Sequence, residues 1–92
     1  MKIIQKDDPE NGVFYIDTNG KIMAEMTYTW AGTDRIIIDH TQVDNSLKGQ
    51  GIGNQLVTKA VEFARAKNIK IVPICPFAKR VLEQTPDFND VL

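Results

Sequence analysis

The sequence contains very few of the side chains that bind metals or form cross-links. It has one cysteine, Cys75, and one histidine, His40. A single cysteine excludes an internal disulfide, and these two residues are too few for the usual ligand set of a structural zinc site. We therefore expect no metal site in this chain.

Long apolar runs and a strong charge of either sign are also missing. No segment approaches the roughly 18 to 20 apolar residues of a membrane-spanning helix, and the N-terminal stretch MKIIQKDDPENG lacks the apolar core of a secretory signal. The net charge is -1, and no run of lysine or arginine resembles a nucleic-acid-binding tail. We expect a cytoplasmic protein that binds neither membranes nor nucleic acids.

The remaining composition is that of an ordinary globular protein. The 92 residues are 42% hydrophobic and 25% charged, without an internal repeat, a low-complexity run or a linker. A chain of this length buries one core and cannot divide it in two. We expect a single domain over residues 1–92.

The N-terminal third alternates apolar and polar residues as β-strands do. Residues 2–6 predict a short strand, followed by the loop sequence DDPENG. Residues 13–30 predict a hairpin that turns at Asn19-Gly20, because this pair tolerates the positive φ angles of a type I′ turn. We expect antiparallel strands on both sides of that turn.

Residues 35–43 are a further β-rich run, RIIIDHTQV. Strict alternation places His40 on the same face as Ile36 and Ile38. We therefore expect His40 either as a packed core residue or as a base held close to a reaction site.

The second half of the chain predicts a helix, a strand and a helix. Apolar residues recur with helical period over residues 50–67, and Asn68 suits a helix end. Residues 69–74 are apolar at nearly every position, as in a strand covered on both faces. Residues 76–84 predict a shorter helix, in which Pro76 occupies the first turn.

These elements combine into one fold class. The strand at 35–43, the helix and the strand at 69–74 form a βαβ unit, whose strands should be parallel. We predict an α/β (α+β) fold, with a mixed sheet of antiparallel N-terminal strands plus this βαβ unit and a short C-terminal helix.

The most distinctive stretch is LKGQGIGNQL, residues 47–56, where three glycines run into the predicted helix. The first N–H groups of a helix have no internal partners and form an anion site when the backbone is bare. The glycines therefore indicate a phosphate cradle rather than only a tight turn. No P-loop sequence and no dinucleotide fingerprint is present.

This stretch resembles motif A of the GNAT superfamily of N-acetyltransferases. Lys48 stands at the position of a glutamine or arginine, and Gly51 and Gly53 stand at the glycine positions. In that family the loop and helix start bind the pyrophosphate of coenzyme A through backbone N–H groups. The resemblance thus assigns cofactor binding to Lys48, Gly49, Gln50, Gly51, Ile52, Gly53 and Asn54.

The resemblance covers roughly residues 21–88 and includes departures from the family pattern. After the last strand the family often has asparagine, alanine and a tyrosine that acts as general acid, where this chain has Cys75, Ala78 and Leu82. The two helices that usually wall the acceptor site are replaced by the short DDPEN. A P-x-C-P-F segment, Pro73 to Phe77, is similar to that of a minimal branch of short acetyltransferase-like proteins.

The remaining cofactor contacts are expected beside the βαβ unit. Pro73 has no N–H, so we predict that the ladder between the two parallel strands is interrupted there. By resemblance, the main-chain groups of Thr41 and Val43 would then bind the pantetheine amides. Further cofactor-binding residues are expected on the last helix and just before it, namely Cys75, Pro76, Phe77, Lys79 and Arg80.

Cys75 and His40 are the catalytic candidates. Cys75 lies between a strand end and a helix start, where the helix dipole lowers the pKa of a thiol. It is either a nucleophile that accepts the acetyl group or a small buried apolar residue. His40 is either a general base, for an incoming amine or for Cys75, or a structural residue.

These observations lead to one preferred function and two alternatives. We expect binding of acetyl-coenzyme A and transfer of the acetyl group to an amine or thiol acceptor, either a small molecule or a protein, through Cys75. The first alternative is a non-catalytic module that binds or senses acyl-coenzyme A. The second is a nucleotide-binding interaction domain whose loop holds another phosphate.

Overall fold

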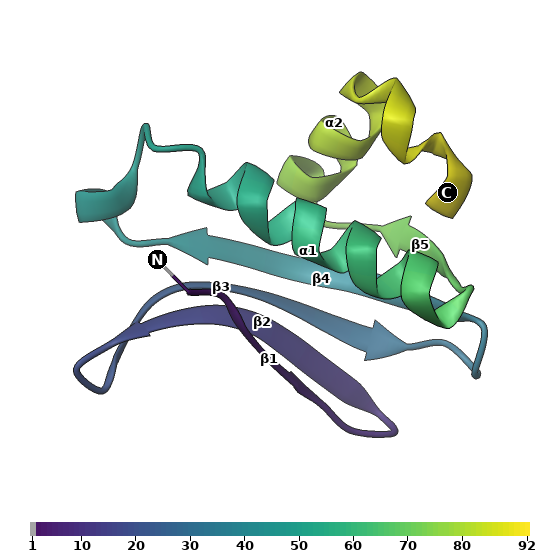
Figure 1. Cartoon of the computed structure of the whole chain (residues 1–92), viewed down its shortest axis with the longest axis horizontal. Helices are drawn as coiled ribbons and strands as arrows, with labels where there is room; N and C mark the ends of the chain where they lie inside the picture. The colour runs from purple at the N-terminus through teal and green to yellow at the C-terminus, as the bar shows by residue number, and fades with distance from the viewer. Residues whose placement is uncertain (1) are drawn as a thin grey trace.

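A computed structural model describes residues 2–92 as one five-stranded sheet with its α-helices packed on one face (Figure 1). The strands are β1 (Ile4–Asp7), β2 (Asn11–Thr18), β3 (Lys21–Trp30), β4 (Arg35–Val43) and β5 (Lys70–Pro73). The helices are α1 (Ile52–Lys67) and α2 (Pro76–Gln84), with short 3-10 helices η1 (Asn45–Leu47) and η2 (Pro86–Val91). Within residues 2–92, no helix is long and apolar enough to cross a bilayer.

The sheet order is β1-β2-β3-β4-β5. The first four strands pair antiparallel with their chain neighbours, whereas β4 and β5 pair parallel across α1. This arrangement confirms the predicted mixed sheet and its βαβ unit. β1 turns directly into β2 through residues 8–10, without an intervening helix, as the short DDPEN predicted.

Two local signals act as predicted. Asn19 and Gly20 have φ angles of 53° and 84°, which form the turn between β2 and β3. Asn68 has a φ of 58°, and its N–H bonds to carbonyls of the last turn of α1. The αL conformation at Asn68 therefore ends α1 where the sequence indicated.

The core lies between the sheet and the helices. Val57, Ala60 and Val61 of α1 are fully buried, as are Ile36 and Ile38 of β4. Burying a side chain of valine or isoleucine size stabilises the fold by about 1.5–3 kcal/mol. The apolar stripe of α1 therefore holds this helix, and the loop ahead of it, against β4.

β5 is covered on one face only, which corrects the prediction for residues 69–74. Ile71 is 2% exposed, whereas Val72 is 36% and Ile74 is 61% exposed. Both helices lie on the same side of the sheet, and among the described residues no element covers the other side. An apolar run shows that a strand is hydrophobic, but the number of covering layers depends on the rest of the chain.

A β-bulge in β4 corrects the expected face of His40. Thr27 pairs with His40 and Tyr28 pairs with Ile38, so Asp39 is an extra residue in β4. Because side chains alternate with period two, one extra residue reverses every later side chain. His40 is consequently exposed on the bare face, and it is not the packed core residue expected beside Ile38.

Candidate functional site

The glycine loop and the start of α1 form an uncapped helix N-terminus. Gly49 and Gly51 have φ angles of 82° and 73°, in the left-handed region that favours glycine. Gly51 is the N-cap of α1 and makes no side-chain capping bond, and the first turn carries no acidic residue. The N–H groups of Ile52, Gly53 and Asn54 are therefore free of helical partners and available to an anion.

A cavity of about 340 Å³ opens in front of these N–H groups. It is bounded by the end of β4, the glycine loop and the first turns of α1 and α2. Its lining residues are Thr41, Val43, Leu47, Lys48, Gly49, Gly51, Ile52, Gly53, Asn54 and Phe77. Leu47 is the one lining residue that the sequence did not indicate, although an apolar side chain just before the glycines was a usable signal.

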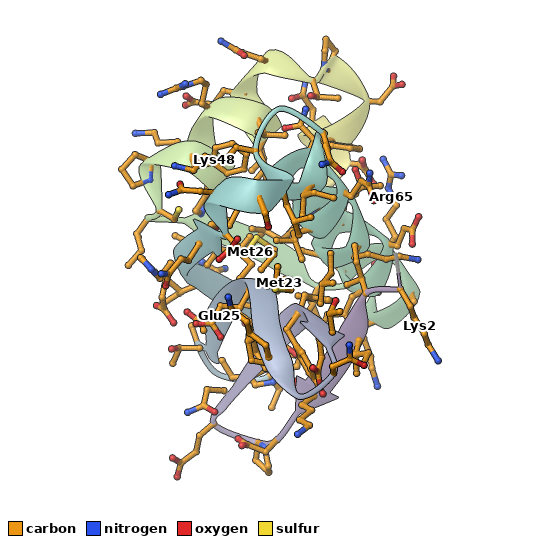
Figure 2. The ribbon with its side chains drawn as sticks, turned by 90° about the vertical axis from the view of Figure 1, so that its left-hand side faces the viewer. Lys2, Met23, Glu25, Met26, Lys48 and Arg65 are labelled. Atoms are coloured by element: carbon orange, nitrogen blue, oxygen red, sulfur yellow. The ribbon has the colours of Figure 1, made fainter. Side chains whose placement is uncertain are left out.

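Lys48 provides the positive charge of this cavity. Figure 2 looks onto the end of the molecule that lies at the left in Figure 1, and it places Lys48 on the loop ahead of α1. Lys48 is exposed and, within residues 2–92, takes part in no ion pair. A cation at a helix N-terminus, together with unpaired N–H groups, favours an anionic ligand.

The three glycines have different structural roles. A Cβ atom added at Gly49 or Gly51 would meet nothing within 4 Å, so these positions need glycine for their φ angles. A Cβ added at Gly53 would collide with the Phe77 ring, including an approach of 2.7 Å to Cε2. Gly53 therefore permits close packing of α1 against the start of α2, and its N–H remains part of the cavity wall.

The parallel pairing of β4 with β5 ends at Ile38 and Pro73, where the sequence predicted an interruption. The predicted cause is wrong, however. Ile74 N–H donates to the Ile38 carbonyl at 3.2 Å, so the alternation of main-chain groups directs the Pro73 nitrogen toward the outer edge of β5. The ladder ends because Cys75 N–H shares the same Ile38 carbonyl, at 3.1 Å, and the chain turns into α2.

The end of β4 consequently has a free edge. Asp44 N–H donates to the Met23 carbonyl of β3 at 2.7 Å. Since the N–H groups of a strand alternate in direction, those of Thr41 and Val43 point away from β3, toward the side that β5 leaves open. These are the main-chain groups that the sequence assigned to an extended ligand.

Cys75 lies at the N-cap of α2, directly behind this edge. Its thiol is buried, with 5% of the residue exposed, and its Sγ lies 3.4 Å from Oγ1 of Thr41. Burial is the largest single influence on the pKa of this thiol and raises it. Hydrogen bonds from the Thr41 hydroxyl and from the N–H groups of Ala78, Phe77 and Thr41 outweigh burial, so the pKa lies below its ordinary value.

Several predicted site residues do not line the cavity. Gln50 is exposed, and its side chain donates to the Ser46 carbonyl at 3.4 Å. Three more exposed residues lie on α2, namely Pro76, Lys79 and Arg80. Cys75 is also outside the lining set and adjoins it through Thr41.

His40 and Leu82 further define the chemistry of the site. His40 lies on the face of β4 opposite Thr41, so its imidazole is directed away from the Cys75 thiol. Leu82 stands where the resembled family often has a tyrosine that acts as general acid. It is 0% exposed, in the core. No general acid can act from position 82.

The comparisons with known proteins agree with this geometry. The family model described as GCN5-related N-acetyl-transferase matches residues 13–91. A GCN5-like protein from Staphylococcus aureus, described as a candidate N-acetyltransferase, is 40% identical, with a TM-score of 0.77 over 98% of this chain and 85% of its own. No curated protein matches the sequence.

More distant solved structures share the fold. A ribosomal-protein-alanine N-acetyltransferase from Brucella melitensis biovar Abortus 2308 is 18% identical, with a TM-score of 0.68 over 84% of this chain and 62% of its own. A transcriptional regulator from Bacillus halodurans C-125 is 26% identical, with a TM-score of 0.65 over 84% of this chain and 59% of its own. This chain is thus shorter than both proteins. The extent of the family match shows that the chain belongs to the GCN5-related N-acetyltransferase family, whose members use acetyl-coenzyme A as co-substrate.

Proposed function

We propose that this N-acetyltransferase binds acetyl-coenzyme A in the cavity at the start of α1. The observation that carries the proposal is the uncapped N-terminus of α1, with bare glycines at Gly49 and Gly51 and a single cation at Lys48. The N–H groups from Gly51 to Asn54 would hold the pyrophosphate. Lys79 and Arg80 of α2, both exposed, are proposed to reach the other phosphate of the cofactor.

The pantetheine arm would follow the free edge of β4. The main-chain groups of Thr41 and Val43 lie on that edge beyond the pairing with β5, and the Thr41 N–H is shared with the Cys75 sulfur. An extended amide chain adds to such an edge in the way that another strand does. This course leads from the glycine loop toward the buried Cys75.

The acetyl group would pass through Cys75. The thiolate would attack the thioester carbonyl; a bond would form between Sγ and the acetyl carbon, the bond from that carbon to the coenzyme A sulfur would break, and the coenzyme A thiolate would take a proton from solvent. An acceptor amine or thiol then attacks the acetyl-Cys75 thioester, loses its proton to solvent or to a base and releases the cysteine. The lowered thiol pKa and the hydrogen bond to Thr41 support this role.

His40 is proposed as the base for an amine that attacks the thioester of coenzyme A directly, as the alternative to the route through Cys75, because His40 lies on the opposite face of β4 from an acetyl group on Cys75. It is exposed on the bare face of the sheet, where no helix within residues 2–92 walls the approach of an acceptor. Its position opposite Thr41 argues against the other expected role, as a base for Cys75. A small molecule and a protein side chain both fit an acceptor site without walls.

Two observations favour a second function, a non-catalytic module that binds acyl-coenzyme A. Leu82 is fully buried in the core, and no helix between β1 and β2 encloses an acceptor. A domain that holds the thioester without transferring it needs neither feature. The two functions share the cofactor cavity and differ only in whether the acetyl group leaves coenzyme A.

One titration distinguishes these functions. Acetyl-coenzyme A is added to the labelled protein and followed by NMR, and the protein is then weighed intact. Transfer through Cys75 predicts shifts over residues 48–55 and the mass of one acetyl group, which is lost in Cys75→Ala. Shifts without that mass, and without turnover on a panel of amines, would favour the binding module. Absence of shifts over residues 48–55 would falsify the cofactor assignment.

A further inference from the structure

Thr41 is the side chain that connects the cavity with the buried thiol. It lines the cavity, and its Oγ1 lies 3.4 Å from Sγ of Cys75. In the described part of the chain, no other side chain forms a hydrogen bond with that sulfur. We propose that Thr41 is a positioning residue, whose hydroxyl holds the Cys75 sulfur beside the cavity and stabilises its thiolate.

The bulge in β4 is what brings Thr41 to this place. Without the extra residue at Asp39, strict alternation would direct Thr41 to the bare face and His40 inward. With the bulge, Thr41 pairs with the buried Met26 on the helix-covered side. Bulges often redirect a side chain near a functional site, and here the redirected group is a hydroxyl beside a cysteine.

The hydroxyl is suited to both protonation states of the sulfur. The thiol donates to Oγ1 of Thr41, and after loss of the thiol proton the hydroxyl rotates and donates to the sulfur. A donor to the charged form lowers a pKa, whereas burial raises it. Deleting the hydroxyl while keeping the shape of the side chain must therefore raise the pKa of Cys75.

Charged groups on the surrounding elements do not account for the same effect. Lys48 lies ahead of α1, Lys79 and Arg80 lie on α2, and His40 points to the opposite face of β4. The larger influences on the pKa of Cys75 are burial and hydrogen bonds, and none of them is one of these charges. The Thr41 hydroxyl is therefore the partner to test first.

The test is the pH dependence of Cys75 alkylation by iodoacetamide in the protein without cofactor. Cys75 is the one cysteine of the chain, so the intact mass reports this site alone. Thr41→Val keeps the branched shape and should raise the apparent pKa by about one unit, which slows alkylation at neutral pH by up to about tenfold. Thr41→Ser keeps the hydroxyl and should retain a pKa near that of the wild type.

Thr85→Val is the matched control, because its hydroxyl bonds to the Val81 carbonyl at the far end of α2. It should leave the pKa of Cys75 unchanged. An unchanged pKa in Thr41→Val would overturn the proposal, as would an equal rise in Thr41→Ser or in Thr85→Val.

The inference rests on the proposed function for its catalytic meaning, but the alkylation assay needs no cofactor. NMR titrations of the wild type and of Thr41→Val with coenzyme A separate a failure of the proposed role of Thr41 from a failure of the cofactor assignment. Normal shifts over residues 48–55 with an unchanged Cys75 pKa reject the role of Thr41 alone. A raised pKa without those shifts in the wild-type protein rejects the cofactor assignment alone.

Discussion

The two halves of β4 belong to one strand but differ in the strands that they pair with. From Ile36 to Ile38 the strand pairs on both edges, with β3 and β5, and Ile36 and Ile38 are 0% exposed. From His40 to Val43 it pairs only with β3, and β4 extends well past the end of β5 (Figure 1). The first half holds the sheet together, and the second has a free edge.

The difference arises from the partner and not from β4 itself. β5 stops after Pro73 because the chain must turn into α2, which brings Cys75 to the last shared hydrogen bond at Ile38. Main-chain groups that a partner strand would have satisfied are left for another partner. A short neighbour is thus enough to leave the end of an ordinary strand with an unpaired edge.

The largest expected contrast is in stability. Ile38→Ala removes a fully buried side chain from the first half and should lower the free energy of unfolding by about 2–5 kcal/mol. Val43→Ala removes a partly buried one from the second half and should cost less, about 1 kcal/mol. Urea denaturation measures both, and equal losses would mean that both halves belong to the core.

The next contrast concerns the glycine loop, which faces the second half of β4. Gly51→Val forces a branched residue into a left-handed conformation, which costs about 1–3 kcal/mol, and it should weaken coenzyme A binding by roughly tenfold or more. Gly20→Val is the control, since Gly20 also has a positive φ and open surroundings but lies in the β2–β3 turn. Calorimetric titration should show lost affinity only for Gly51→Val, and a similar loss in both variants would return the glycines to a purely structural role.

The pH dependence of the stability tests the lowered pKa of Cys75. The pKa of Cys75 is lower in the folded protein than its ordinary value, which represents the unfolded chain. Its contribution to stability is therefore complete above the ordinary thiol pKa and is lost as the pH falls through the folded-state pKa. The stability of the wild type relative to Cys75→Ala should rise with pH across this window, in urea unfolding under reducing conditions. A pH-independent difference would contradict the lowered pKa.

The smallest effect is expected for Pro73→Ala. The nitrogen of Pro73 faces the outer edge of β5, so a restored N–H adds no bond to β4. The free energy of unfolding should change by less than about 1 kcal/mol, and coenzyme A binding should be unchanged. Loss of binding in this variant would show that the missing N–H does hold the two strands apart.

Much of the fold could be predicted because its signals are local. The bounds of the strand at 35–43 and of the helix at 76–84 match β4 and α2, and the turn at Asn19-Gly20 and the helix end at Asn68 are where the sequence placed them. Positive φ angles, helix caps and apolar periods depend on residues within a few positions of each other. Most residues that line the cavity were likewise predicted, since the glycine loop is a continuous stretch.

The parts that could not be predicted depend on pairing between distant segments. The bulge at Asp39 exists only in the register between β3 and β4, so alternation within residues 35–43 placed His40 on the wrong face. The bare side of β5 reflects where both helices pack, and the role of Gly53 reflects the Phe77 ring of another helix. No residue pattern within a single helix or strand predicts any of these features.

The sequence by itself determined the order of the elements and the open N-terminus of α1, because a helix start after left-handed glycines exposes its N–H groups wherever it lies in a fold. Only the tertiary structure decided that the glycine loop opens beside the free edge of β4, and that Thr41 rather than His40 faces Cys75. The physical reason is that side-chain direction follows strand register, which is set by the packing of the whole sheet.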